Sequence, residues 1–155
     1  MSLFEIKEPK STIDFDSYFY FRWKILRRPY GQPLGTEKDD HEKSSYHLMS
    51  VDSLNEIVGV GRIHIFNDEL IKKNAQIRYM AVLENNRFNG IGTEILKQLE
   101  KHAFSNKVNN IILNSRENAI DFYKKNGYEV IKKTHILYDS IQHWMMSKSN
   151  NKYLK

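Results

Sequence analysis

Residues 76–93 read QIRYMAVLENNRFNGIGT, and this stretch decides how the chain folds. Its first part, Gln76 to Leu83, is rich in apolar and β-prone residues and predicts a strand. Gly90 and Gly92 follow at the start of an amphipathic segment, which predicts a tight turn into a helix. A helix start presents free N–H groups and the positive end of the helix dipole, which together bind a pyrophosphate through the backbone. An ordinary strand-to-helix turn that needs glycine for its geometry is the alternative.

The residues after this turn predict a helix and then a second strand. Apolar residues recur at helical spacing and mark one face, at Ile91, Ile95, Leu96, Leu99 and Ala103. A strand candidate at residues 110–114 follows the helix immediately. Strand, helix and strand in this order form a βαβ unit.

The N-terminal half predicts a helix, a long loop and antiparallel strands. Residues 16–28 carry apolar side chains at helical spacing, and a proline follows them. The loop at residues 29–40 is expected to lead into a helical turn, with Thr36 as its cap. Strands are predicted at residues 46–51, 57–66 and 76–83. Gly59 and Gly61 interrupt the alternation in the second strand, which predicts a bulge.

The C-terminal third predicts a short helix and two more strands. Asn118 with Asp121 resembles a helix start, and Gly127 a helix end. The strands are predicted at residues 128–132 and 141–147, with a loop at 134–140. Residues 148–155 are polar and aperiodic, so we expect a frayed tail there. The sequence therefore predicts a single domain over residues 1–147, with a mixed α/β fold.

Composition excludes several classes of protein. The chain has 155 residues and no cysteine, which excludes disulfides, thiolate zinc sites and a cysteine nucleophile. No apolar run approaches the roughly 20 residues of a membrane span, and the first residues lack a signal-peptide pattern, so we expect a cytoplasmic protein without membrane contact. The net charge of +5 suits nucleic acid, membrane phosphates or a polyanionic cofactor. The pairs Arg27-Arg28 and Lys72-Lys73 lack interleaved aromatic residues, so nucleic acid is not an expected partner.

Two motifs at a characteristic spacing show a family resemblance. Arg-x-x-Gly-x-Gly spans Arg87 to Gly92 after the apolar strand, and Asn-Ala-x-x-Phe-Tyr-x-x-x-Gly-Tyr spans Asn118 to Tyr128. The pair resembles the acetyl-CoA signature of the GNAT superfamily of N-acetyltransferases. The resemblance implies a central mixed, mostly antiparallel sheet with a splayed strand pair, flanked by about four helices. Residues 26–37 are also similar to a poorly characterised bacterial branch of that superfamily.

The resemblance implies that acetyl-CoA binds along the splayed strand and the glycine turn. Backbone groups of Met80, Ala81 and Val82 would hold the pantetheine arm, and an N–H near Met80 would face the thioester oxygen, where negative charge develops. Core packing of the same side chains is compatible with this role, because only main-chain atoms bind. For Asn118 a helix cap is an equal alternative, and Phe122 also suits packing. The other expected cofactor contacts are Arg87, Phe88, Asn89, Gly90, Ile91, Gly92, Thr93 and Asn114.

The resemblance also names candidates for the chemistry. Tyr123 matches the tyrosine that protonates the departing CoA thiolate in many family members, and a phenol is a plausible donor to a thiolate. Its alternative is a core aromatic residue. Gln76 stands where histone-acetylating relatives have a glutamate base, and an amide cannot accept the proton. His143 or a chain of water molecules would then deprotonate the amine, whereas His47 and His64 suit structural positions.

The predicted function is acetyl transfer from acetyl-CoA to the amine of a small molecule or peptide, directly and within a ternary complex. The alternative is an acyl-CoA-binding sensor or interaction module without turnover, which Gln76 leaves open and Tyr123 opposes. Residues 39–42, Asp-Asp-His-Glu, are expected to form a solvated charged turn and not a metal site, since adjacent residues cannot all face one ion. The sequence leaves the acceptor and the oligomeric state open, a homodimer included.

Overall fold

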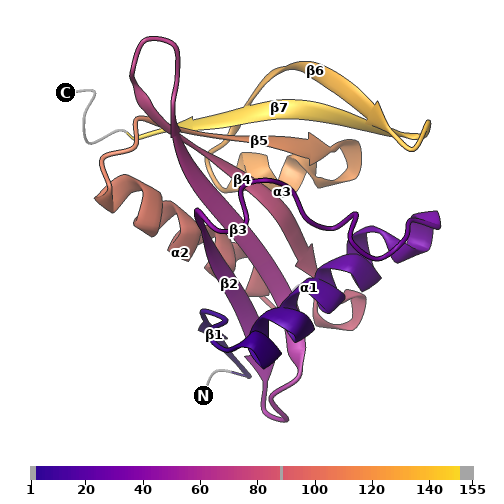
Figure 1. Ribbon diagram of the computed structural model, residues 1–155. Coiled ribbons are helices and arrows are strands. Elements are labelled where there is room, and N and C mark those ends of the chain that lie inside the picture. Colours follow the sequence, from indigo (N-terminus) through magenta and orange to yellow (C-terminus); the bar gives the residue numbers. More distant parts are fainter. Residues whose placement is uncertain (1–2, 88, 151–155) are drawn as a thin grey trace.

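The computed structural model describes residues 3–87 and 89–150, which form a seven-stranded sheet with helices on both faces (Figure 1). The strands are β1 Phe4–Lys7, β2 Ser45–Asp52, β3 Ile57–Asn67, β4 Lys73–Val82, β5 Asn110–Arg116, β6 Glu129–Leu137 and β7 Ile141–Ser149. The helices of these residues are α1 Thr12–Leu26, α2 Ile91–Ser105 and α3 Ile120–Lys125, with 3-10 turns η1 Arg28–Tyr30, η2 Glu84–Asn86 and η3 Glu117–Ala119. The predicted mixed α/β class is confirmed, with three α-helices in the described residues where about four were expected.

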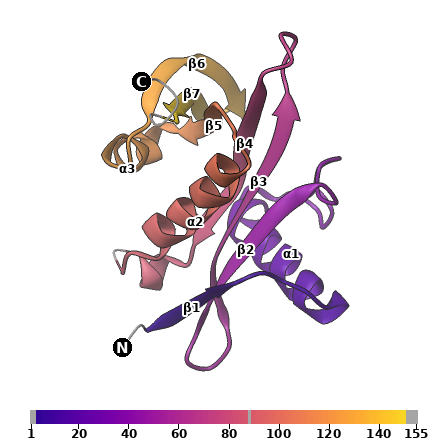
Figure 2. The same cartoon turned by 90° about the vertical axis from the view of Figure 1, so that its left-hand side faces the viewer.

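The sheet is mostly antiparallel, and its strands lie in the order β1-β2-β3-β4-β5-β7-β6. Among the described strands the one parallel pair is β4–β5. Parallel neighbours need a crossover connection, and α2 supplies it, which confirms the predicted βαβ unit. Figure 2 shows α2 on one face of the sheet and α1 on the other.

The parallel strands separate after a short ladder. They pair from Asn74↔Asn110 to Ile77↔Leu113. Beyond that point β4 stays beside β3, while β5 continues beside β7. This is the splayed pair that the family resemblance implied, and the gap opens where β4 carries residues 78–82.

A bulge in β4 lies at the start of the splay. Val60 pairs with Ala81 and Arg62 with Arg78, so two residues of β4 oppose Gly61. One of the two, Tyr79, has a positive φ of 60°. A Cβ on Gly61 would lie 2.6 Å from the Met80 sulfur, so the close approach requires glycine. The bulge predicted at Gly59 and Gly61 is therefore confirmed: opposite Gly61 the extra residue lies on β4, and beside Gly59 the β2–β3 ladder shifts register, with Val58 as the extra residue.

The face of the sheet under α2 is aliphatic. Ile95, Leu96, Leu99 and Ala103 of this helix are fully buried, as the helical spacing predicted. Tyr18 and Phe21 of α1 pack on the opposite face, against Met49, Val60 and Ala81. Two apolar clusters therefore hold the sheet, one under each of the two helices.

The face under α1 also buries charge. Arg22 and Arg62 are 0% exposed. Arg62 bonds both carboxylate oxygens of Asp39, at 2.6 and 3.0 Å, and both arginines donate to Glu42 Oε2. The expectation of a solvated turn holds for Asp40 and His41, which are exposed. It is wrong for Asp39 and Glu42, because their carboxylates neutralise buried guanidinium groups. In residues 3–87 and 89–150, no group of three or more His, Asp or Glu side chains could hold a metal ion.

The N-terminal segments differ from prediction for local reasons. Helix α1 starts at Thr12, because Ser11 and Asp14 form a reciprocal capping box. Strand β1 was not predicted; it pairs antiparallel with β2. No helix follows the loop at residues 29–40. There the Thr36 hydroxyl donates to the Pro33 carbonyl, and the Glu37 carboxylate accepts from the Gly35 N–H, so the segment closes as turns.

The C-terminal strands are longer than predicted. Strand β6 runs to Leu137 and replaces most of the predicted loop. Strand β7 runs to Ser149, and Lys148 forms a 2.8 Å salt bridge with Glu100 of α2. Lys148 and Ser149 therefore belong to the sheet and not to the predicted tail. The helix start proposed at Asn118 is also wrong: α3 begins at Ile120 without a side-chain cap.

Candidate active site

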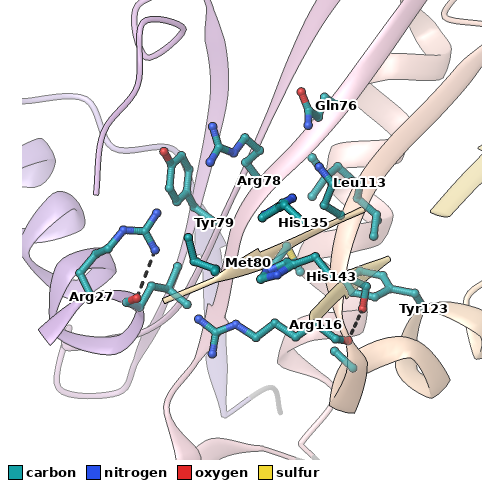
Figure 3. A pocket seen from close by; sticks show the side chains of 16 residues that line it. Arg27, Gln76, Arg78, Tyr79, Met80, Leu113, Arg116, Tyr123, His135 and His143 are labelled. Carbon is teal, nitrogen blue, oxygen red and sulfur yellow. Dashed lines mark hydrogen bonds between the residues drawn. The ribbon is translucent and has the colours of Figure 1, made fainter. Parts of the chain in front are cut away.

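A cavity of about 390 Å³ opens where β4 and β5 separate (Figure 3). Seven elements contribute lining residues, from α1 and its C-cap on one side of the cavity to η3 and α3 on the other. The lining residues are Leu26, Arg27, Gln76, Ile77, Arg78, Tyr79, Met80, Leu113, Asn114, Ser115, Arg116, Ala119, Tyr123, His135, Leu137 and His143. Both predicted catalytic residues, Tyr123 and His143, are among them.

The glycine turn leaves the start of α2 open. Gly90 is the N-cap residue of this helix, has a φ of 80°, and no side chain caps the helix there. A Cβ built on Gly90 would meet nothing within 4 Å. Free N–H groups and open space at a helix start suit an anion.

Gly92 has a different reason to be glycine. A Cβ at this position would lie 3.3 Å from the tip of the Phe122 ring, so α3 packs closely on the first turn of α2. Phe122 is thus a packing residue in this structure. Ile91 is buried, whereas Arg87 and Asn89 are exposed. Phe88, a predicted cofactor contact, lies outside the described residues.

The three predicted backbone contacts on β4 separate into different surroundings. Met80 follows the bulged residue and lines the cavity. Ala81 is buried in the cluster under α1, and Val82 packs against the core under α2. Met80, the residue after the positive-φ position in the bulge, therefore lies at the edge of the cavity.

Arginine side chains surround Tyr79 at the bulge. The guanidinium carbons of Arg22, Arg78 and Arg62 lie 4.1, 4.7 and 5.1 Å from the centre of its ring. Cations over an aromatic face are held by the quadrupole of the ring. These contacts hold the strained residue that precedes Met80.

Tyr123 projects from α3 toward the cavity. Its side chain is 8% exposed, and its ring makes edge contacts with Phe122 and Tyr128. Within the part of the chain that the structure describes, its hydroxyl has no hydrogen-bond partner. Burial raises the pKa of Tyr123 above its ordinary value, so the phenol keeps its proton at neutral pH. The core-packing role and a free hydroxyl donor coexist in one residue.

His143 lies on β7 at the centre of Figure 3 and is 7% exposed. Its Nδ1 lies 3.0 Å from the Ile141 carbonyl oxygen, which can only accept, so Nδ1 carries the proton. Burial lowers the pKa of His143, and His135 and Arg116 lower it further. The ring is therefore neutral at pH 7, with a lone pair on Nε2.

Sequence reasoning missed His135, which stacks on His143 with ring centres 4.5 Å apart. The ladder shifts register between Lys133 and Ile136, so two residues of β6 oppose His143. This bulge lies in the segment that was predicted as a loop. The β-branched residues Thr134 and Ile136 were the available signal for a strand.

The site also contains arginines that the sequence did not indicate. Arg27 ends α1, Arg78 lies on β4 and Arg116 ends β5, and all three line the cavity. They are distant in sequence, so no motif joins them. Gln76 and Asn114 line the cavity too, whereas Asn118 is exposed and lies away from it.

The other two candidate histidines are structural. His47 is buried, and its ring nitrogens contact the Tyr18 hydroxyl and the Glu42 carbonyl at 2.9 and 2.8 Å. His64 stacks on His41, with ring centres 4.3 Å apart. Neither lines the cavity.

Comparison with known proteins assigns this architecture to a family. The model of the acetyltransferase (GNAT) family matches residues 10–128. The chain belongs to the GNAT acetyltransferase family. It is 32% identical over 130 residues to YjcF, an uncharacterized N-acetyltransferase of Bacillus subtilis (strain 168), covering 84% of this chain and 89% of YjcF.

Solved structures share the GNAT fold at low identity. An acyl-CoA N-acyltransferase from Pseudomonas aeruginosa superposes with a TM-score of 0.75 at 14% identity, covering 94% of this chain and 98% of that one. An aminoglycoside 6'-N-acetyltransferase complexed with coenzyme A gives a TM-score of 0.73 at 17% identity, covering 94% and 96%. In the described residues of this GNAT protein, no helix is both long and apolar enough to cross a membrane.

Proposed function

We propose that this GNAT protein transfers an acetyl group from acetyl-CoA directly to the amine of a small acceptor bound in the same complex. The observation that carries the proposal is the cavity between the splayed strands, where Met80, Tyr123 and His143 meet. An N-acetyltransferase relative and the GNAT family itself support the reaction class.

The chain has a fitting place for the donor. The uncapped start of α2 and the open space at Gly90 suit a pyrophosphate, and the splay gives an extended arm a path into the cavity. The acetyl thioester would supply an activated acyl group at that point. Crystals of an aminoglycoside acetyltransferase of the same fold hold coenzyme A, which supports this class of ligand.

Three groups of this chain would act on the reaction. The Met80 N–H would donate to the thioester oxygen as negative charge develops on it. The neutral His143 ring would accept a proton from the attacking amine through Nε2. Tyr123, which stays protonated at neutral pH, would give its proton to the departing thiolate. Gln76 also lines the cavity, but its amide has no basic atom that could accept the proton of the amine.

A binding and turnover experiment tests the proposal. Acetyl-CoA should raise the melting temperature by mass action, and a panel of amines should release free CoA. Gly90→Asp should abolish most of that shift, because a carboxylate would stand where the pyrophosphate approaches. Gly31→Asp is the matched control, since Gly31 also has a positive φ, 70°, and nothing within 4 Å of its Cβ position.

The outcomes separate the two functions that the sequence left open. Absence of a thermal shift at millimolar acetyl-CoA would contradict the donor site. A shift without CoA release over a broad amine panel would favour an acyl-CoA-binding sensor. If Gly90→Asp and Gly31→Asp reduced the acetyl-CoA-induced rise in melting temperature equally, the turn at Gly90 would contribute to folding alone.

A further inference from the structure

The cavity wall on the α1 side carries more positive than negative charge. Arg27, Arg78 and Arg116 line it, and no aspartate or glutamate is among the described lining residues. Figure 3 shows the guanidinium groups of Arg27 and Arg78 beside Tyr79, and that of Arg116 below Met80 and turned away from Tyr123. A cavity built for a plain cationic amine would carry the opposite charge.

Two of the three arginines lack a carboxylate partner. Arg78 is paired with Asp39 at 2.8 Å. Arg27 donates through Nε to the Thr36 carbonyl at 2.9 Å, and Arg116 donates through Nη1 to the Tyr30 hydroxyl at 3.0 Å. Within the described residues, neither side chain lies within 4 Å of an acidic group. Both are half-buried, so a neutral partner leaves much of their charge uncompensated.

These arginines lie on the opposite face from the proposed pyrophosphate site. Arg116 is opposite His143 in the β5–β7 ladder and bonds Tyr30, which follows α1. Arg27 is the C-cap residue of α1 itself. Gly90 begins α2, which covers the other face of the sheet (Figure 2). The phosphates of a donor at Gly90 would therefore not neutralise Arg27 and Arg116.

The charges and the histidines of the cavity indicate which chemical groups an acceptor would carry. His143 and His135 stack at the same wall. His143 is neutral, so its ring does not offset the positive charge of the arginines. A polycationic amine would be repelled here, whereas an anionic group would pair with these two guanidinium groups, which bond only neutral partners in the described residues. Leu26 and Leu137 line the same cavity and would offer apolar contacts to a short carbon chain.

We infer that the acceptor is a small amine that also carries an anionic oxygen group, a carboxylate or a phosphate, which Arg27 and Arg116 bind. This inference rests on the proposed acetyl transfer and deepens it. The anionic end anchors the acceptor at the α1 wall. The amine then points toward His143, which takes its proton, and toward the acyl group beside Met80.

Matched pairs of acceptors test the inference. γ-Aminobutyrate is compared with its primary amide, and O-phosphoethanolamine with ethanolamine, each at the same concentration of free amine. In the wild-type protein we expect kcat/KM for at least one anionic member to exceed that of its neutral partner by about ten- to a hundredfold, as expected of charge-assisted hydrogen bonds. The member that is preferred distinguishes a carboxylate from a phosphate.

Arginine variants locate the effect. Arg27→Gln and Arg116→Gln should each lower the anionic-to-neutral ratio toward one, mainly by raising KM, while acetyl-CoA affinity stays unchanged. Arg116→Lys should recover part of the ratio, because it restores charge without the fork. Arg28→Gln is the control, since Arg28 is exposed and does not line the cavity. Melting temperatures confirm that each variant is folded.

Two results would overturn the inference in distinguishable ways. If neutral amines are acetylated as well as or better than their anionic partners, this inference is wrong while the proposed function stands. If no amine in the panel releases CoA, the proposed function is wrong and the inference with it. The wild-type ratio needs no variant, so a folding defect cannot hide either result.

Discussion

The two faces of the sheet are held by different forces. Under α2 the fully buried side chains are apolar, with Leu99 among them. Under α1 the fully buried side chains include Arg22 and Arg62, paired with carboxylates of residues 39–42. The first face depends on contacts that any apolar residue of suitable size can make. The second depends on charges that must all be present, because one unpaired buried ion is costly.

Loss of Arg62 should have the largest effect. Arg62→Ala leaves Asp39 without its two-atom partner in a partly buried site, so we expect the free energy of unfolding to fall by about 3–5 kcal/mol. Urea unfolding followed by circular dichroism measures it. The double variant Arg62→Met with Asp39→Asn should recover a substantial part, since it removes both charges. Failure of the second change to recover stability would show that packing, and not charge, holds this face.

A truncation on the other face sharpens the contrast. Leu99→Ala should reduce the free energy of unfolding by about 3 kcal/mol through lost burial and a cavity. Because no charge is involved, the loss should be the same at low and high salt concentration. A strong salt dependence would mean that the α2 face also relies on electrostatics.

A change at Tyr123 tests whether the apolar cluster under α2 contributes a side chain to acetyl transfer. Tyr123→Phe keeps the ring contacts with Phe122 and Tyr128 and removes the hydroxyl, so kcat should fall by about 10²-fold with acetyl-CoA affinity unchanged. The measurement needs an acceptor for which product release is not limiting. Wild-type turnover in this variant would leave the Met80 N–H as the main catalytic contribution.

The smallest expected effect is the dependence on pH of the free energy of unfolding, which comes from a histidine on the α1 face. The pKa of His64 is lowered to about 4, mainly by burial and then by the positive charges of His41, Arg62 and Arg78, against the raising effect of Asp39. An unfolded histidine titrates near 6.5, so between pH 6.5 and 4 the unfolded state binds more protons. The free energy of unfolding should therefore fall as pH falls through this range. His64→Asn should flatten that slope, and an unchanged slope would assign it to the other buried histidines.

The two faces also explain what sequence reasoning could reach. Helix α2, its glycine turn and the βαβ order follow from patterns within a short stretch, so this part of the fold was predicted closely. The arginine and histidine lining of the cavity was not predicted, because Arg27, Arg116 and His135 come from three distant elements. His135 reaches the wall only through a register shift in β6. Arg62 was missed for a related reason, since an alternating strand pattern does not predict a buried ion pair.

The short β4–β5 ladder has a consequence for the time course of folding. Strands β1 to β4 pair in antiparallel fashion, and β2 to β4 do so through nearby turns, whereas the pairs from Asn74↔Asn110 to Ile77↔Leu113 form only after the α2 segment has closed. Closing a long segment is entropically slower than closing a turn. Amides of β2 and β3 should therefore gain protection from hydrogen exchange early in refolding. Those of β5 should follow later, so the cavity assembles after the sheet that supports it.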